Sequence, residues 1–128
     1  METKATLIEK KQTSFDKLKI IKLYLYYKLM DMSILDKFSS RDINILSNLY
    51  IYGGTTKETF GSFIDLCYSL NLCKEGSENS IRNCLTLARE NGIVKRRRSK
   101  EWKIDKDILP QEPSDLLYLK LFLTNYDL

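Results

Sequence analysis

Residues 77–105, SENSIRNCLTLARENGIVKRRRSKEWKID, carry the pattern that decides the fold. The first half predicts a helix with one narrow apolar stripe, formed by Ile81, Cys84, Leu85 and Ala88. Ser77 is expected to cap the start of this helix, and Gly92 to end it, because glycine adopts the left-handed conformation that follows a helix. The second half predicts a β-hairpin, with strands near residues 93–94 and 102–104 and a polar turn at 98–101.

Two helices with clear start signals are expected before this stretch. Ser39 with Asp42 three residues later forms a shortened capping box, and Gly53 and Gly54 end the helix that follows. The buried face of this helix is expected to comprise Ile43, Leu46, Leu49 and Tyr50. Thr55 or Thr56 is expected to cap the next helix, because threonine hydroxyls accept hydrogen bonds from the first turn. The apolar stripe of that helix comprises Phe60, Phe63, Ile64, Cys67 and Leu70.

The N-terminal third of the chain divides into a polar and an apolar part. Residues 1–13 are mostly polar and are expected to form an N-terminal arm. Residues 14–30 predict an amphipathic helix, although their tyrosines and isoleucines leave a strand open as an alternative. The apolar face of the expected helix comprises Phe15, Leu18, Ile21, Leu25 and Leu29. Tyr24, Tyr26 and Tyr27 are expected to rim a core or an interface rather than to stack on bases.

The C-terminal segment is set off by prolines and is strongly apolar. Pro110 and Pro113 mark a linker, and residues 114–128, SDLLYLKLFLTNYDL, fit a strand and a capped helix equally well. A segment this apolar is expected to pack on the body, on the N-terminal segment or on another subunit. We expect residues 110–128 to serve packing or oligomerisation, after a domain at 14–109. The apolar residues assigned to this interface are Leu117, Leu119, Leu121 and Leu123.

These elements give a mainly α-helical fold with a small β-hairpin. Ser40, Arg41 and Asp42, followed by Ile45 and Leu46, resemble the opening of helix-turn-helix output domains in bacterial regulators and sigma factors. Ser77, Ser80, Ile81 and Leu85 resemble the recognition-helix pattern of the same superfamily. Gly92, Ile93 and Val94, before a basic hairpin, resemble winged-helix repressors. The resemblance covers roughly residues 39–105 and implies a winged helix-turn-helix with an N-terminal helix and an apolar C-terminal tail.

Composition and charge set the class of protein. The chain has 128 residues, of which 43% are hydrophobic and 30% charged, as in an ordinary globular domain. Its net charge is +4, yet residues 89–106 contain eight Lys and Arg against three acids, a surplus of +5, which leaves −1 for the rest. Such clustering suits a polyanionic partner. With neither a secretory signal nor a membrane span in the pattern, we expect a cytoplasmic protein, in host cytoplasm or virion if phage-encoded.

The helix and hairpin of residues 77–105 are therefore expected to bind double-stranded DNA. Turning the helix with its stripe inward leaves Asn79, Asn83, Thr86 and Glu90 outward, flanked by Arg82 and Leu87. Asparagine pairs with adenine edges, arginine with guanine or phosphate, and the basic hairpin would hold the backbone. Trp102 is expected to seal the sheet against this helix, with stacking on a base as the alternative. The candidate nucleic-acid-binding residues are Asn79, Ser80, Arg82, Asn83, Thr86, Lys95, Arg96, Arg97, Arg98, Lys100 and Lys103.

Catalysis finds little support in the sequence. The chain contains no histidine and no glycine-rich phosphate loop, and Cys67 and Cys84 lie on apolar stripes. We expect neither a metal nor a cofactor, and neither a small-molecule substrate nor a membrane partner. The sequence predicts a non-enzymatic DNA-binding regulator of phage or mobile-element type that forms homo-oligomers. The alternative is a structural protein of a phage virion or packaging assembly, with Leu87 and the C-terminal segment in subunit contacts.

Overall fold

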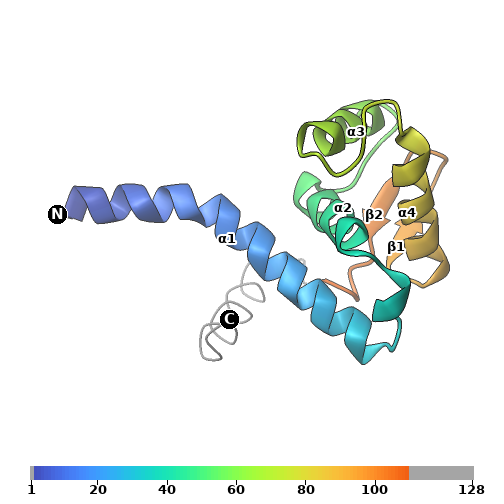
Figure 1. The fold of residues 1–128 in the computed structure, drawn as a ribbon, viewed down its shortest axis with the longest axis horizontal. Coiled ribbons are helices and arrows are strands. Elements are labelled where there is room, and N and C mark those ends of the chain that lie inside the picture. Colours follow the sequence, from blue (N-terminus) through green and yellow to red (C-terminus); the bar gives the residue numbers. More distant parts are fainter. Residues whose placement is uncertain (1, 110–128) are drawn as a thin grey trace.

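The computed structural model describes the backbone of residues 2–109 and the side chains of residues 17–109. The elements in chain order are α1 (Glu2–Asp31), a short 3-10 helix η1 (Leu35–Lys37), α2 (Ser40–Tyr52), α3 (Phe60–Ser69), α4 (Glu78–Glu90), β1 (Val94–Arg96) and β2 (Trp102–Ile104). Within the described residues the fold is mainly helical with a two-stranded antiparallel sheet, as predicted (Figure 1). The expectations for Pro110, Pro113, Leu117, Leu119, Leu121 and Leu123 lie outside the described residues.

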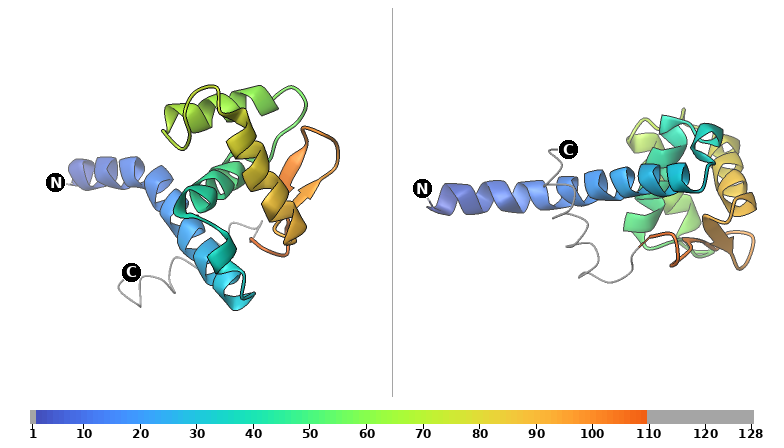
Figure 2. Two further views of the ribbon diagram at one scale, coloured as in Figure 1. Left: turned by 45° about the vertical axis from the view of Figure 1, so that its right-hand side comes forward. Right: turned by 90° about the horizontal axis from the view of Figure 1, so that it is seen from below.

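Helix α1 is longer than expected. The helix predicted over residues 14–30 is present, and the strand alternative is wrong, but the helix already begins at Glu2. Residues 2–13, expected to be an arm, are therefore part of α1. Ile21, Leu25 and Leu29 are buried in the core, and this half of the helix packs against α2. The N-terminal half projects away from the other helices (Figures 1 and 2).

The two serine caps expected from the sequence behave differently. The Ser39 hydroxyl accepts a hydrogen bond from the Asp42 amide at 3.1 Å, and Asp42 accepts one from the Ser39 amide at 3.0 Å. This confirms the capping box at the start of α2. Ser77 occupies the cap position of α4, but its hydroxyl makes no capping hydrogen bond. The reason is the backbone, because Ser77 has a ψ of 44° whereas Ser39 has the extended ψ of 166° that a side-chain cap requires.

The approach to α3 also differs in detail from the prediction. Thr56 and Thr59 exchange hydrogen bonds, with the Thr56 amide donating to the Thr59 hydroxyl at 2.8 Å and the Thr59 amide donating to the Thr56 hydroxyl at 3.3 Å. These bonds close the turn before α3, but the cap position of the helix is Thr59, and its hydroxyl makes no capping bond. The prediction that Thr55 or Thr56 caps this helix is therefore wrong. Leu70 was expected on the buried stripe of α3 but is 46% exposed, because the helix ends at Ser69 and the side chain leaves the stripe.

The core is formed between α1, α2, α3, α4 and the inner face of the sheet. The four residues of the predicted stripe on α4 are all buried: Ile81, Cys84, Leu85 and Ala88. Gly92 has a φ of +78°, which confirms it as the residue that ends the helix. Burial raises the pKa of the Cys67 thiol to about 12 and shifts that of Cys84 in the same direction. Among the described residues, none of the helices combines the length and apolar character needed to cross a bilayer.

The basic hairpin, residues 94–104, is attached to the end of α2. β1 and β2 pair in an antiparallel register that sets Val94 against Ile104, Lys95 against Lys103 and Arg96 against Trp102. Beyond the end of α2, the Thr55 amide donates to the Trp102 carbonyl at 2.8 Å, so Thr55 extends the sheet at the free edge of β2. Gly54 lies so close to this edge that a Cβ on it would stand 2.9 Å from the Trp102 carbonyl oxygen. A glycine is therefore required where α2 meets β2.

We expect Gly54→Ala to destabilise the protein more than Gly53→Ala. Both glycines have a φ near +85° (+88° for Gly53 and +84° for Gly54), so alanine costs about 1 kcal/mol at either position. Only the Gly54 Cβ meets atoms of β2, which adds a similar or larger penalty. Urea unfolding followed by Trp102 fluorescence would compare the two variants. Equal losses of unfolding free energy would show that contact between β2 and a Cβ at position 54 carries no steric penalty.

Candidate functional site

Helix α4 presents a polar face to solvent. Asn79, Asn83 and Glu90 are exposed, and Thr86 is half-buried at the edge of the same face. Figure 2 shows α4 and the basic hairpin as neighbouring elements, and α4 packs against β1. The predicted outward face of α4 is thus exposed, and the helix that carries it lies next to the basic hairpin.

The residues that flank this face are less free than the sequence suggested. The Arg82 Nε donates to the Glu78 carboxylate at 2.7 Å, and its guanidinium lies 4.7 Å from the centre of the Phe60 ring. Arg82 is therefore held between α4 and the start of α3. Leu87 was expected to face outward, but it is half-buried and packs against the core. Leu87 is on the flank of the helix, one turn from the buried Cys84 and next to the buried Ala88, which explains why it turns inward.

The basic hairpin distributes its cations over both faces of the sheet. Lys95 and Lys103 are opposite each other on the outer face, and the Lys95 ammonium lies 3.6 Å from the Asp105 carboxylate. Arg96 shares the inner face with Trp102, and its guanidinium lies 4.9 Å from the centre of the indole ring. Arg97, Arg98 and Lys100 are exposed around the turn. One short hairpin thus carries six cations, with Glu101 as its one acid and Asp105 directly after it.

Trp102 is a structural residue. Its side chain is 2% exposed, and Arg96 covers the outer side of the ring. Stacking on a base, the alternative reading of this tryptophan, is therefore excluded by its burial. Trp102 and the buried stripe of α4 belong to one core cluster. The strand that carries Trp102 packs against α2, while β1 packs against α4, so the expectation that Trp102 seals the sheet against α4 stays a prediction.

Thr55 positions the hairpin, although its sequence context predicted a cap of the next helix. Its hydroxyl donates to the Lys100 carbonyl at 2.7 Å and accepts from the Trp102 amide at 3.2 Å. Together with its own amide, which donates to Trp102, the residue makes three hydrogen bonds to the hairpin and is 6% exposed. A threonine directly after a Gly-Gly helix stop has the sequence context of a cap for the next helix. Only the tertiary structure shows that its hydroxyl binds Lys100 and Trp102 of the hairpin instead.

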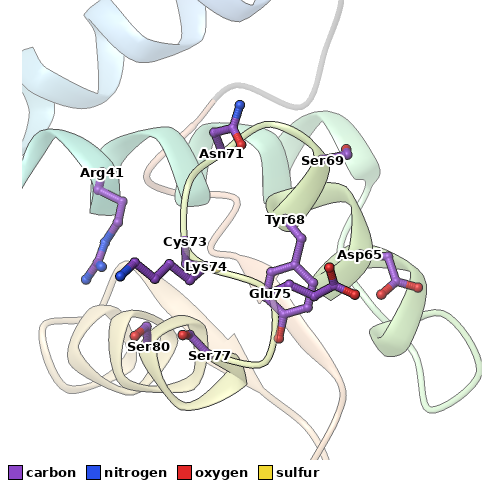
Figure 3. A pocket seen from close by; sticks show the side chains of 10 residues that line it. All are labelled: Arg41, Asp65, Tyr68, Ser69, Asn71, Cys73, Lys74, Glu75, Ser77 and Ser80. Carbon is purple, nitrogen blue, oxygen red and sulfur yellow. The ribbon is translucent and has the colours of Figure 1, made fainter.

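An open cleft of 840 Å³ lies where α2 begins, α3 ends and α4 begins (Figure 3). Arg41 and Lys74 extend into it near Ser77 and Ser80, and Asp65 and Glu75 line the opposite part with Tyr68. Two cations and two acids thus line the cleft, so its charge favours neither an anion nor a cation. Ser80, predicted to contact nucleic acid, is half-buried and lines this cleft instead of the outward face of α4.

Within the described residues, histidine, cysteine and acidic side chains form no group of three or more that could hold a metal ion. In comparisons with known proteins, no family model matches the chain, and neither a curated protein nor a solved structure matches it. The functional interpretation therefore depends on the geometry of α4 and the basic hairpin.

We expect Thr55→Val to loosen the hairpin, since valine keeps the shape of threonine but removes the hydroxyl that binds Lys100 and Trp102. The loss removes a partner of the Lys100 carbonyl and leaves the buried Trp102 amide unsatisfied, at a cost of about 1 to 3 kcal/mol in unfolding free energy. Thr55→Ser keeps the hydroxyl and is the matched control. Chemical denaturation gives the free energy, and amide hydrogen exchange of residues 97–103 reports on the hairpin. An unchanged exchange rate in Thr55→Val would contradict the anchoring role.

Proposed function

We propose that this chain is a double-stranded DNA-binding protein that uses α4 as a recognition helix and the basic hairpin as a wing. The observation that carries the proposal is that the hairpin with its six cations lies next to α4, whose polar face is exposed. The order of three helices followed by a hairpin, with α4 directly before it, supports a winged helix-turn-helix arrangement of residues 39–105. Neither an enzymatic step nor a cofactor is part of the proposal.

The distribution of cations on the hairpin fits a groove of duplex DNA. A groove has a phosphate backbone on each side, so a hairpin that enters it meets phosphates with both of its faces. Lys103 is on one face, Arg96 on the other, and Arg98 and Lys100 are at the tip. A hairpin that only lay along one strand would need cations on a single face. Arg97, Arg98 and Lys100 have no side-chain partner in the described residues and are available to phosphates.

Helix α4 would supply contacts to bases. Asn79 and Asn83 are four residues apart on the exposed face, and the asparagine amide pairs with the N6 and N7 edge of adenine in the major groove. Arg82 is oriented by Glu78 and Phe60, so it would contact DNA from the flank of the helix rather than its centre. Glu90 lies at the C-terminal end of the face, which places the N-terminal turns of α4 deepest in the groove.

A second candidate function, a subunit of a phage-type assembly, is favoured by a different observation. The N-terminal half of α1 projects away from the other helices, as an element that binds another protein would (Figure 1). An isolated helix of this kind gains most of its stability from packing. In this case duplex DNA would not bind even at low salt, and sedimentation would show a defined oligomer.

The first test is the salt dependence of binding to random-sequence duplex, followed by fluorescence anisotropy. We expect the logarithm of the binding constant to fall linearly with the logarithm of salt concentration. Replacing Arg97, Arg98 and Lys100 by alanine should make this slope shallower by roughly 2 to 3, because each lost phosphate contact removes about 0.9. Arg96 is retained in this variant, since it covers Trp102.

The matched control replaces Lys17, Lys19 and Lys28 by alanine, which removes the same charge from α1 on the other side of α2. Its slope should stay close to that of the wild type. If both variants changed the slope equally, DNA would sense the net charge of the protein and not the hairpin. If wild-type protein bound no duplex at low salt, the proposal would be wrong.

A second test concerns α4. Asn83→Asp changes one amide to a carboxylate of the same shape in the middle of the exposed face. We expect duplex binding to weaken by about tenfold or more, because the carboxylate is repelled by the phosphates that line the groove. Asn71→Asp makes the same change at an exposed position outside this face and should have a smaller effect. Equal affinities of the two variants, measured in the same anisotropy assay, would remove α4 from the interface.

A further inference from the structure

Glu78 and Arg82 form a coupled pair at the N-terminal end of α4. The Arg82 Nε donates a hydrogen bond of 2.7 Å to Oε2 of Glu78, one turn earlier on the same helix. The Arg82 guanidinium also lies 4.7 Å from the centre of the Phe60 ring, which is buried at the start of α3. The arginine is thus held by an acid and by an aromatic ring, and 32% of its side-chain surface stays exposed.

The atoms that this arrangement leaves unbound are two donors and one acceptor. Neither terminal nitrogen of Arg82 makes a hydrogen bond to the residues that the structure describes. The same holds for Oε1 of Glu78, whose side chain is 46% exposed. A guanidinium that is bound through Nε keeps the N–H bonds of its two terminal nitrogens, and these bind two neighbouring acceptors as a fork. The pair therefore presents a two-donor fork beside an acceptor.

The carboxylate beside Arg82 argues against a phosphate as its partner. The negative charge of Glu78 repels a phosphate and offsets the positive charge that would attract it. The hairpin differs in this respect, because Arg97 and Arg98 are exposed and pair with no acid in the described part of the chain. The hairpin is thus better suited to phosphates, whereas the partner of Arg82 has to offer a donor to the Glu78 carboxylate as well as acceptors to the guanidinium.

A G·C base pair offers this combination in the major groove. Guanine presents O6 and N7 as neighbouring acceptors, and the paired cytosine presents its N4 amino group as a donor. Bidentate contact of an arginine with O6 and N7 is the commonest base-specific contact, and glutamate accepts from N4 of cytosine. Adenine presents N7 beside its N6 donor, so the fork of an arginine finds only one acceptor there. The free atoms of the pair therefore match G·C better than A·T.

We propose that Arg82 and Glu78 read one G·C base pair, with Arg82 donating to O6 and N7 of guanine and Glu78 accepting from N4 of cytosine. The inference rests on the proposed function and adds the base pair that the start of α4 selects. Because Glu78 and Phe60 already hold the guanidinium, less side-chain freedom is lost when the contact forms. Glu78 thus positions Arg82 in addition to contacting the base pair.

The test starts with the selection of preferred sites from a pool of randomised duplexes by the full chain. The selected duplex is then compared, by fluorescence anisotropy, with duplexes in which one G·C pair is replaced by A·T or one guanine by 7-deazaguanine, which lacks the N7 acceptor. We expect either change, at one position of the site, to weaken binding of the wild type by about tenfold or more. Arg82→Lys keeps the charge but not the fork, so it should bring this ratio of affinities close to one.

Two further variants separate base reading from a structural role. Glu78→Gln keeps the shape of the side chain but removes the carboxylate that orients Arg82. We expect it to lower the ratio between the G·C and A·T duplexes, and to tighten binding to random duplex because one negative charge is lost. A merely structural role would weaken binding to both duplexes equally. Arg41→Lys makes the arginine-to-lysine change at an exposed position of α2 and should keep the wild-type ratio.

The outcomes distinguish a failure of this inference from a failure of the proposed function. If the wild type binds random duplex with the expected salt slope but selects no G·C pair, the inference is overturned while DNA binding stands. It is also overturned if Arg82→Lys weakens binding to all duplexes equally and keeps the wild-type ratio, because Arg82 would then contact phosphate. If the wild type binds no duplex at low salt, both the inference and the proposed function are wrong.

Discussion

Three hydrogen bonds from Thr55 to the basic hairpin join two parts of the chain that are 45 residues apart, and the candidate site depends on them. Strands of three residues form too few hydrogen bonds to be stable alone in water. The hairpin therefore depends on the burial of Val94, Trp102 and Ile104, and on its attachment at Thr55. Because Thr55 follows the Gly53 and Gly54 stop of α2, the end of that helix fixes where the hairpin lies relative to α4.

This attachment matters because the hairpin is electrostatically unfavourable. Lys95 and Lys103 lie directly opposite each other, and like charges in that position destabilise a strand pair. Asp105 offsets part of the repulsion through its contact with Lys95, while Arg97, Arg98 and Lys100 add more positive charge around the turn. Stability alone would favour acids among these cations. Anchoring of the hairpin in the core offsets the repulsion among its cations. Its positive charge therefore stays available for a polyanion.

The helices and their ends were predictable because their causes are local. The stripe on α4, the capping box of Ser39 with Asp42 and the stop at Gly92 follow from side-chain spacing and from backbone conformations that the residue types themselves favour. The burial of Trp102 and the second strand at residues 102–104 were predicted in the same way, whereas the first strand covers Val94–Arg96 and not residues 93–94. The basic and polar faces were thus correctly located as exposed surfaces, and their role in binding DNA stays a prediction.

The features that the sequence did not reveal depend on partners distant in the chain. Thr55 has the residue type of a cap, and its true partners are on a hairpin that folds back to it. Leu87 was placed by helical rotation alone, which does not show how far the core reaches around the flank of α4. Ser77 has the right type and position for a cap, yet the loop before it sets a ψ that turns the hydroxyl away. Residues 2–13 contain few apolar side chains, so their polar composition suggested an arm. They instead continue the helix whose second half packs against α2.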